Sequence, residues 1–481
     1  MKHYSFLIGG QDLESVTGRR LEMLNPSTGV AFASIPRGDH RDVDIAVASA
    51  KEALAARSWS RMAPADRGRI LSRLAAAIQE RRTELAHLEG QDTGKPLEQA
   101  LGDIDVTSRY LEYYAGAADK IGGETIPLPA GYTALTLREP HGVIAAILPW
   151  NSPAQVLGRV LGPALAMGNV MIVKPAEDAC LSILLIARIA LEVGLPPGVL
   201  NIVTGTGVEA GAPLASHSDV SFITFIGSPE VGTVVQEAAA KHHAGVSLEL
   251  GGKSPHIVFS DADLDLALPI IVKSLVLNAG QSCVAGTRVL VENSAYDKVA
   301  SRLAELFRAL RTGAFDSEAP DYGPLINAKQ LRRVQGFISQ ASADGINVLA
   351  EGQMLPDADP NGNFVRATLF GPVPPDNILA REEVFGPVLA LLRFDDEQDA
   401  VALANGTEYG LGAAVWTQDV SRAMRVARAV RAGQVFINSY SVGGGVELPF
   451  GGFGKSGHGR EKGIEAMRQF SALKTIIRSH G

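Results

Sequence analysis

Continuous apolar runs and amphipathic stretches alternate along most of the chain. Short hydrophobic runs read VIAAIL (143–148), VMIV (170–173) and SFITFI (221–226), and helix-like segments such as 181–193 lie between them. Runs of this length are typical of strands buried on both faces of a parallel sheet, although any single run could be a buried helix. The alternation predicts a doubly wound α/β domain.

A second alternating stretch begins near residue 287. It contains predicted strands at 287–292, 387–392, 413–416 and 434–438, with a helical pattern over 296–311. Because strand and helix patterns again follow each other, this stretch predicts a second α/β domain.

The remaining segments show two other patterns. Hydrophobic residues recur at helical spacing from 64 to 88, which predicts one long amphipathic helix that Gly94 and Pro96 stop. The last residues, 472–479, have the pattern of an exposed strand or an irregular tail, which would be unstable alone. We expect this strand to pair with a sheet edge elsewhere.

Composition and charge narrow the range of functions. The chain has 481 residues, of which 46% are hydrophobic and 20% charged, as in a globular protein of two or three domains. With 44 Lys and Arg against 52 Asp and Glu, the net charge of −8 argues against nucleic acid or an anionic membrane as the main partner. No apolar run reaches the roughly 20 residues of a membrane span, and the first residues show no secretory pattern. We therefore expect a soluble, cytoplasmic protein.

Cysteine and histidine positions bear on metal and redox chemistry. The only two cysteines, Cys180 and Cys283, exclude a disulfide framework and a Cys-rich zinc site and suit a reducing cytosol. Adjacent His242 and His243 would diverge on a helix, so no metal is expected there. Cys180 adjoins an apolar helical face and is typical of a core thiol. Cys283, in the glycine-flanked string GQSCVAG, is a candidate nucleophile.

Two residues at predicted strand ends could serve such a nucleophile. Glu249, in LELGGKSP, could be a desolvated general base, although a capping role is about equally favoured. Asn151, in PWNSP, could donate its amide N–H to an oxyanion, although taken alone a turn role is favoured.

Cofactor-binding candidates follow other predicted strands. Gly227, Ser228 and Gly232, in FIGSPEVG, open a helical stretch that could seat a pyrophosphate. Lys174 and Glu177, in KPAE, could hydrogen-bond a ribose, and the carboxylate would repel a 2′-phosphate.

Taken together, the strings PWNSP, KPAE, FIGSPEVG, LELGGKSP, GQSCVAG, EEVFGPV and PFGGFGKSGHGRE resemble, in this order, the motifs of the NAD(P)-dependent aldehyde dehydrogenase superfamily. The resemblance implies that Cys283 attacks an aldehyde to give a thiohemiacetal and then a thioester. It implies that Asn151 and the Cys283 N–H form the oxyanion hole, and that Glu249 activates the hydrolytic water. It favours NAD as the cofactor.

The resemblance also implies which residues surround the reaction. The expected cofactor contacts are Trp150, Lys174, Glu177, Gly227, Ser228, Gly232, Leu250, Glu383 and Phe385. Glu461 matches a proposed proton-relay carboxylate. The residue after Arg159, where relatives often have a lysine, is Val160.

Departures from the family pattern concern the substrate. Ser152 and Arg159 replace residues that are aromatic in many relatives. The loop 441–445 lacks an aromatic residue that relatives often have there, and Phe450, which follows it, is a candidate substrate contact. A wider, less aromatic tunnel is therefore expected. Arg159 matches an arginine of members that act on succinic semialdehyde and could bind a substrate carboxylate. A surface or subunit-contact role for Arg159 stays open, and so does a bulky aromatic or terpenoid aldehyde as the substrate.

The implied fold has a Rossmann-type NAD-binding domain (1–121 and 141–250), an α/β catalytic domain (251–465) and a small β oligomerisation arm (122–140 and 466–481). Arm strands that pair with a neighbouring subunit imply a homodimer or homotetramer. Two alternatives are a CoA-acylating relative, which would generally lack the general base, and a catalytically silent structural protein on the same scaffold.

Overall fold

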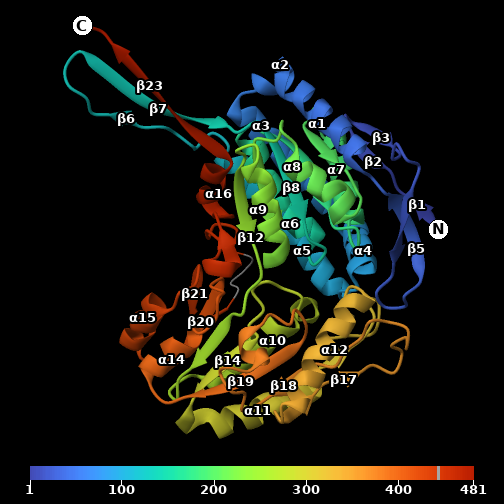
Figure 1. The fold of residues 1–481 in the computed structure, drawn as a ribbon, viewed down its shortest axis with the longest axis vertical. Helices are drawn as coiled ribbons and strands as arrows, with labels where there is room; N and C mark the ends of the chain where they lie inside the picture. Colours follow the sequence, from blue (N-terminus) through green and yellow to red (C-terminus); the bar gives the residue numbers. More distant parts are fainter. Residues whose placement is uncertain (441–444) are drawn as a thin grey trace.

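Two sheets, each with helices packed on it, make up the body of the molecule (Figure 1). The computed structural model describes residues 1–440 and 445–481. The first sheet has the spatial order β22 (Gly457–His458), β12 (Gly245–Glu249), β11 (Phe222–Ile226), β8 (Val143–Leu148), β9 (Val170–Pro175), β10 (Leu200–Ile202), β2 (Phe6–Ile8) and β3 (Gln11–Leu13). Strands β12, β11, β8, β9 and β10 are parallel, as their continuous apolar sequences predict.

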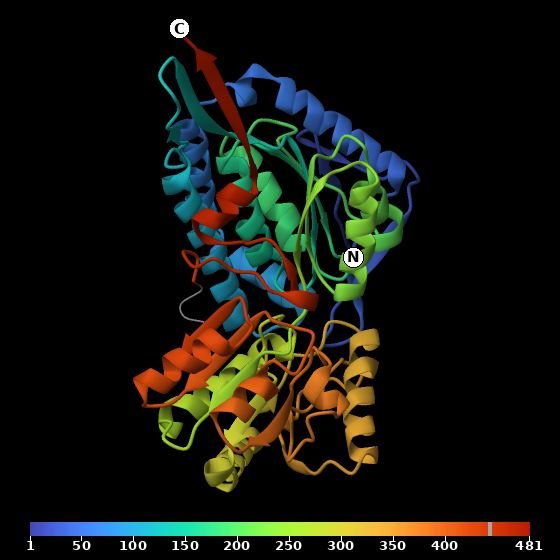
Figure 2. The same ribbon diagram turned by 60° about the vertical axis from the view of Figure 1, so that its left-hand side comes forward.

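The helices of the first sheet are α1 (His40–Ala55), α6 (Pro153–Ala166), α7 (Leu181–Glu192), α8 (Ala212–Ser216) and α9 (Pro229–Ala240). The connections β8–α6–β9 and β11–α9–β12 run in opposite directions along the sheet. Right-handed crossovers therefore place α6 and α9 on opposite faces, and Figure 2 shows helices on both sides. This is the predicted doubly wound arrangement.

The second sheet forms the other half of the body. Its order is β16 (Val348–Glu351), β18 (Thr368–Phe370), β19 (Val388–Phe394), β14 (Arg288–Glu292), β13 (Pro255–Val258), β20 (Gly412–Trp416) and β21 (Gln434–Ile437). All pairs except β16–β18 are parallel. Its helices are α10 (Leu264–Val276), α11 (Tyr296–Ala309), α12 (Ala328–Ala343), α13 (Ile378–Arg381), α14 (Glu397–Ala404) and α15 (Val420–Ala429). The second α/β domain is thus confirmed.

The predicted single helix over 64–88 is wrong. The chain forms α3 (Pro64–Glu80) and α4 (Arg82–Thr93), which are separated at Arg81, whose φ of −104° and ψ of 20° leave the helical region. Both helices pack on α5 (Leu97–Ala117), and α2 (Arg57–Ser60) precedes them. The hydrophobic spacing continues across the break, so periodicity alone does not reveal it.

Among the described residues, no helix is long and apolar enough to cross a membrane.

A three-stranded antiparallel arm projects from the body, with the C-terminus at its tip (Figure 1). It consists of β6 (Thr125–Ile126), β7 (Tyr132–Pro140) and β23 (Ser471–Ser479). Strand β23 pairs with β7 over its whole length, from Ser471 opposite Pro140 to Ser479 opposite Tyr132. The exposed terminal strand is thus confirmed, and its partner is a strand of the same chain.

The chain returns to the first sheet near its C-terminus. Strand β22 pairs with β12, and α16 (Gly463–Gln469) follows it. Val446, Ala466, Met467 and Phe470 belong to the hydrophobic cluster of the first sheet. Residues that close the second domain in sequence therefore pack against the first.

Smaller elements complete the fold. They are β1 (Lys2–His3), β4 (Arg20–Leu24), β5 (Ala31–Pro36), β15 (Arg311–Thr312), β17 (Gln353–Met354), and the short helical turns η1 (Gly207–Gly211), η2 (Leu277–Gly280), η3 (Asn293–Ala295) and η5 (Gly454–Ser456).

Candidate active site

Three predicted catalytic residues lie together although they are distant in sequence. Asn151 follows β8, Glu249 ends β12, and Cys283 lies in the loop between η2 and β14. Asn151 Nδ2 donates a hydrogen bond of 3.0 Å to the main-chain oxygen of Gln281, and Glu249 interacts with the Cys283 thiol. Ligands bind at the carboxyl ends of parallel strands, where this cluster lies.

The loop before Cys283 has an unusual backbone. Asn278, Ala279 and Gly280 all have positive φ, at 50°, 56° and 75°. A left-handed conformation costs an alanine about 1–2 kcal/mol, so the surrounding structure must hold it. At Gly280 a Cβ atom would lie only 2.4 Å from the Gly386 carbonyl carbon, which explains the glycine.

The two thiols differ as the sequence indicates. Cys180 is fully buried, whereas Cys283 is partly exposed. Burial raises the pKa of the Cys283 thiol, and the nearby charge of Glu249 raises it further. A protonated thiol needs a proton acceptor before it can attack, and the Glu249 carboxylate, which interacts with it electrostatically, is the candidate acceptor.

A buried arginine links two buried carboxylates behind the thiol. Arg159 Nη2 lies 3.5 Å from Glu249 Oε2, and Arg159 Nε lies 2.8 Å from Glu461 Oε2. Burial raises the pKa of Glu249 to about 7, Arg159 opposes this shift, and Glu461 adds to it. Arg159 is only 8% exposed, so the surface alternative is wrong for this chain.

Phe450 lies between two cationic side chains. The Arg159 guanidinium is 5.3 Å from its ring centroid, and the Lys462 ammonium is 4.7 Å from it. Phe450 and Glu461 also exchange main-chain hydrogen bonds. The ring is buried, so its contact with a substrate stays a prediction. Residues 441–444 of the aromatic-poor loop lie outside the described residues.

Predicted nicotinamide contacts converge near Cys283. Glu383 accepts a hydrogen bond of 2.9 Å from the Gly252 N–H, and burial raises its pKa to about 7. A Cβ atom at Gly251 would lie 2.3 Å from Glu383 Oε2, so only glycine permits this approach. Trp150 and Phe385 pack edge to face with centroids 5.4 Å apart.

The other cofactor candidates lie at the ends of β9 and β11. Lys174 Nζ pairs with Glu177 Oε2 at 2.8 Å. Ser228 caps α9 by accepting a hydrogen bond from the Val231 N–H, and Gly227 directly precedes it. The helix therefore presents a capped N-terminus suited to a phosphate group.

Gly232 and Leu250 join α9 to the catalytic strand end. A Cβ atom at Gly232 would lie 2.8 Å from a Leu250 methyl group, so the glycine lets the helix approach. Val231 and Val234 on the same helix are 49% and 57% exposed and offer apolar surface. The cofactor roles of these residues stay predictions, but the residues themselves lie along one edge of the first sheet.

Comparison with known proteins agrees with this geometry. Residues 13–476 match the sequence model of the Aldehyde dehydrogenase family. The chain belongs to this family.

Individual relatives are similar over their full length. The mitochondrial aldehyde dehydrogenase of Equus caballus is 42% identical over 96% of this chain and 92% of its own. A putative aldehyde dehydrogenase from Burkholderia cenocepacia superposes with a TM-score of 0.98 at 55% identity, covering 99% of this chain and 100% of its own. Betaine aldehyde dehydrogenase from Staphylococcus aureus, solved with NAD+, has a TM-score of 0.96 at 33% identity, over 99% and 95% of the two chains.

The reasoning from sequence missed three polar residues of this aldehyde dehydrogenase site. Asn278 Nδ2 donates to the main-chain oxygen of Asn151 at 2.6 Å, and Lys95 Nζ donates to the same oxygen at 2.9 Å. Lys462 is partly buried, and desolvation lowers the pKa of its ammonium to about 8. The one available signal was position, because Asn278 lies two residues before the string GQSCVAG and Lys462 directly follows Glu461.

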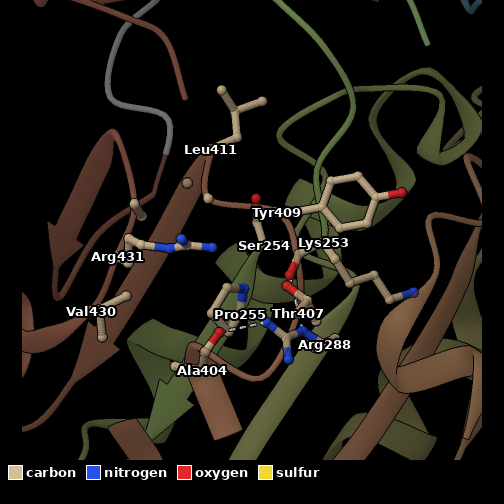
Figure 3. Close-up of a pocket in the computed structure, with 13 residues that line it drawn as sticks. Lys253, Ser254, Pro255, Arg288, Ala404, Thr407, Tyr409, Leu411, Val430 and Arg431 are labelled. Atoms are coloured by element: carbon tan, nitrogen blue, oxygen red, sulfur yellow. Dashed lines mark hydrogen bonds between the residues drawn. The ribbon is translucent and has the colours of Figure 1, made fainter. Parts of the chain in front are cut away.

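A small cavity is lined by residues that include Lys253, Ser254 and Arg288 but none of the three predicted catalytic residues (Figure 3). Its volume of about 10 Å³ holds roughly one water molecule. Arg288, one of its cationic lining residues, donates to the main-chain oxygens of Lys253, Leu403 and Ala404. The cavity is therefore too small for substrate or cofactor, and this guanidinium is used to hold the main chain.

The charges around Glu249 predict opposite pH shifts. Arg159→Met should raise the pKa of Glu249 and move the acid limb of aldehyde oxidation to higher pH by about one unit, because an opposite charge is lost. Glu461→Gln should lower that pKa and move the limb to lower pH, because a like charge is lost. Steady-state rates between pH 5 and 9 measure both.

The matched control is Arg302→Met, which removes an arginine from a surface pair with Asp265. It should leave the profile unchanged. Shifts of the same sign in the Arg159 and Glu461 variants would contradict this account of the charges.

Proposed function

We propose that Cys283, Asn151 and Glu249 are the nucleophile, oxyanion donor and general base of an NAD-dependent aldehyde dehydrogenase that releases a carboxylic acid. The chain's activity is that of its family, the oxidation of aldehydes. The observation that carries the assignment is the buried Glu249 carboxyl, which interacts electrostatically with the Cys283 thiol and has a pKa raised to about 7. A base poised near neutral pH suits proton transfer from both a thiol and a water molecule.

The first step is addition of the thiol to the aldehyde. Ionised Glu249 takes the Cys283 proton, Sγ bonds to the carbonyl carbon, and the carbonyl oxygen becomes an oxyanion. The Asn151 amide has two donor hydrogens, and one already serves the Gln281 oxygen. The other amide hydrogen and the Cys283 N–H stabilise the oxyanion.

The second step releases the acid. Bound NAD would supply a hydride acceptor for the substrate carbon, and Cys283 would then carry the acyl group as a thioester. Glu249 first releases the Cys283 proton to solvent. The ionised carboxylate then removes a proton from a water molecule as that water attacks the thioester, and the thiolate departs. Arg159, which is itself paired with Glu461, lies 3.5 Å from Glu249 and holds the carboxylate in place through these transfers.

The residues present fit NAD as the cofactor. The capped N-terminus of α9 offers N–H groups to a pyrophosphate, and Glu383 and Phe385 line the approach to Cys283. The Lys174–Glu177 pair favours NAD over NADP because the carboxylate repels a 2′-phosphate. The NAD+ bound to the Staphylococcus aureus relative supports this proposal.

Substitution of the nucleophile and substitution of the base should have different effects on NADH formation. Cys283→Ala should abolish NADH formation while NAD binding persists. Glu249→Gln should slow the NADH burst, because the acceptor of the Cys283 proton is lost, and should lower steady-state turnover about 100-fold or more, because general base catalysis of hydrolysis is lost as well. Stopped-flow absorbance measures both phases. Cys180→Ala is the matched control and should keep full turnover, whereas activity in Cys283→Ala would refute the mechanism.

For the substrate, we propose a neutral aldehyde rather than one that carries a carboxylate. The Arg159 guanidinium already faces Glu249 and Glu461. A substrate carboxylate at Arg159 would add a third negative charge in a buried space, at a large desolvation cost. This favours the aromatic or terpenoid alternative over the semialdehyde one.

A panel of aldehydes tests the substrate class. Benzaldehyde and hexanal should exceed succinic semialdehyde in kcat/KM by about tenfold or more, because the carboxylate is repelled. Arg159→Met should leave the order of the three substrates unchanged. A loss confined to succinic semialdehyde would show instead that Arg159 binds a substrate carboxylate.

We also propose that the chain assembles as a homodimer or homotetramer through its arm. Leu473 and Ile477 on the edge strand β23 are 59% and 64% exposed, which favours burial against a neighbouring subunit.

A cytoplasmic location stays a prediction from the sequence.

Assembly through the arm can be measured by light scattering. Ile477→Glu should yield a species of lower mass than the unaltered chain, because a charge would be buried at the subunit contact. Lys298→Glu, a charge change on α11, is the control. A monomeric unaltered chain would contradict the proposal.

A further inference from the structure

A buried lysine lies directly behind the proposed oxyanion donor. Lys95 follows α4, and its side chain is 1% exposed. Its ammonium donates to the Asn151 main-chain oxygen at 2.9 Å and to Ser152 Oγ at 3.3 Å. The mechanism above does not use this lysine, although burying an ammonium is costly unless the group is paired.

Two carboxyl groups hold the ammonium from the other side. Lys95 forms an ion pair with Asp103 of α5, and its Nζ lies 3.6 Å from Glu89 Oε1 of α4. Glu89 also accepts hydrogen bonds from Ser182 Oγ and from the Ala154 N–H in the first turn of α6. Lys95 thus connects α4 and α5 to the turn that carries Asn151.

The Asn151 main-chain oxygen is bound on two sides. Besides Lys95, Asn278 Nδ2 donates to it at 2.6 Å, so both lone pairs of this oxygen are used. Asn278 Nδ2 also lies 3.3 Å from the Gln281 oxygen, which accepts the Asn151 amide. The peptide plane of Asn151 and the direction of its side chain are therefore set together.

We infer that Lys95 is a positioning residue for the oxyanion hole. It fixes the Asn151 main chain so that one amide hydrogen meets the Gln281 oxygen and the other faces the oxygen that develops charge on the Cys283 adduct. This inference rests on the proposed function of Asn151. Lys95 itself touches neither substrate nor cofactor.

The expected effect follows from preorganisation. Loss of one oxyanion donor costs about 10²–10³ in rate, and a donor that is present but free to turn loses part of that. Lys95→Met keeps the length of the side chain and removes its donors. It should slow the NADH burst about tenfold or more at saturating aldehyde.

A double-mutant cycle separates positioning from general structural damage. The burst rate is measured for Lys95→Met, Asn151→Ala and the double variant, with NAD affinity measured by fluorescence titration. Lys95→Met should lose its effect, to within about twofold, once Asn151 is alanine, because it acts through that side chain. NAD affinity should stay within about twofold throughout.

Two further variants guard against misfolding. Lys95→Met combined with Asp103→Asn removes the buried pair together and should show the same slow burst. Asp103→Asn alone keeps the Lys95 donors to Asn151 and should retain the burst within about twofold.

The outcomes are distinct. If Lys95→Met lowers the burst rate equally with and without Asn151→Ala, the inference is overturned and the proposed function stays intact. A full burst in Asn151→Ala would overturn the oxyanion role of Asn151, and the inference with it. A Cys283→Ala variant that still formed NADH would refute the proposed function itself.

Discussion

The site depends on one buried ion-pair arrangement, in which the Arg159 guanidinium lies between the carboxylates of Glu249 and Glu461. Three distant segments meet here: Arg159 on α6, Glu249 at the end of β12, and Glu461 in the segment that returns to the first sheet. Without the guanidinium, two buried carboxyl groups would have to share one proton beside a thiol. The arrangement thus sets both the packing of α6 and the basicity of Glu249.

A second polar network complements the first from the opposite side of the α6 turn. Lys95 and Asn278 bind the main chain of Asn151, while Arg159, two turns further along α6, faces Glu249. The proposed donor and the proposed base are therefore both oriented by buried charged or amide groups. Such support keeps reacting groups in place without movement during the reaction.

Local patterns predicted much of this fold. The continuous apolar runs became β8, β9 and β11, and Cys283, Glu249 and Asn151 meet as their motifs indicate. The break at Arg81 was not predicted, because helical spacing of apolar residues is the same in one helix as in two that pack on one neighbour. Lys95 was missed because its partners Asp103 and Asn151 are apparent only once the chain is folded.

By itself, the sequence determined the α/β alternation, the family and the candidates for the reacting groups, because residue type and local period encode these properties directly. The tertiary structure decided what Arg159 does. A guanidinium at that position could face solvent, a substrate or another protein group, and its sequence neighbours are compatible with each. Burial and distance make the choice, because the strength of an ion pair depends on both, and neither is a property of a local segment.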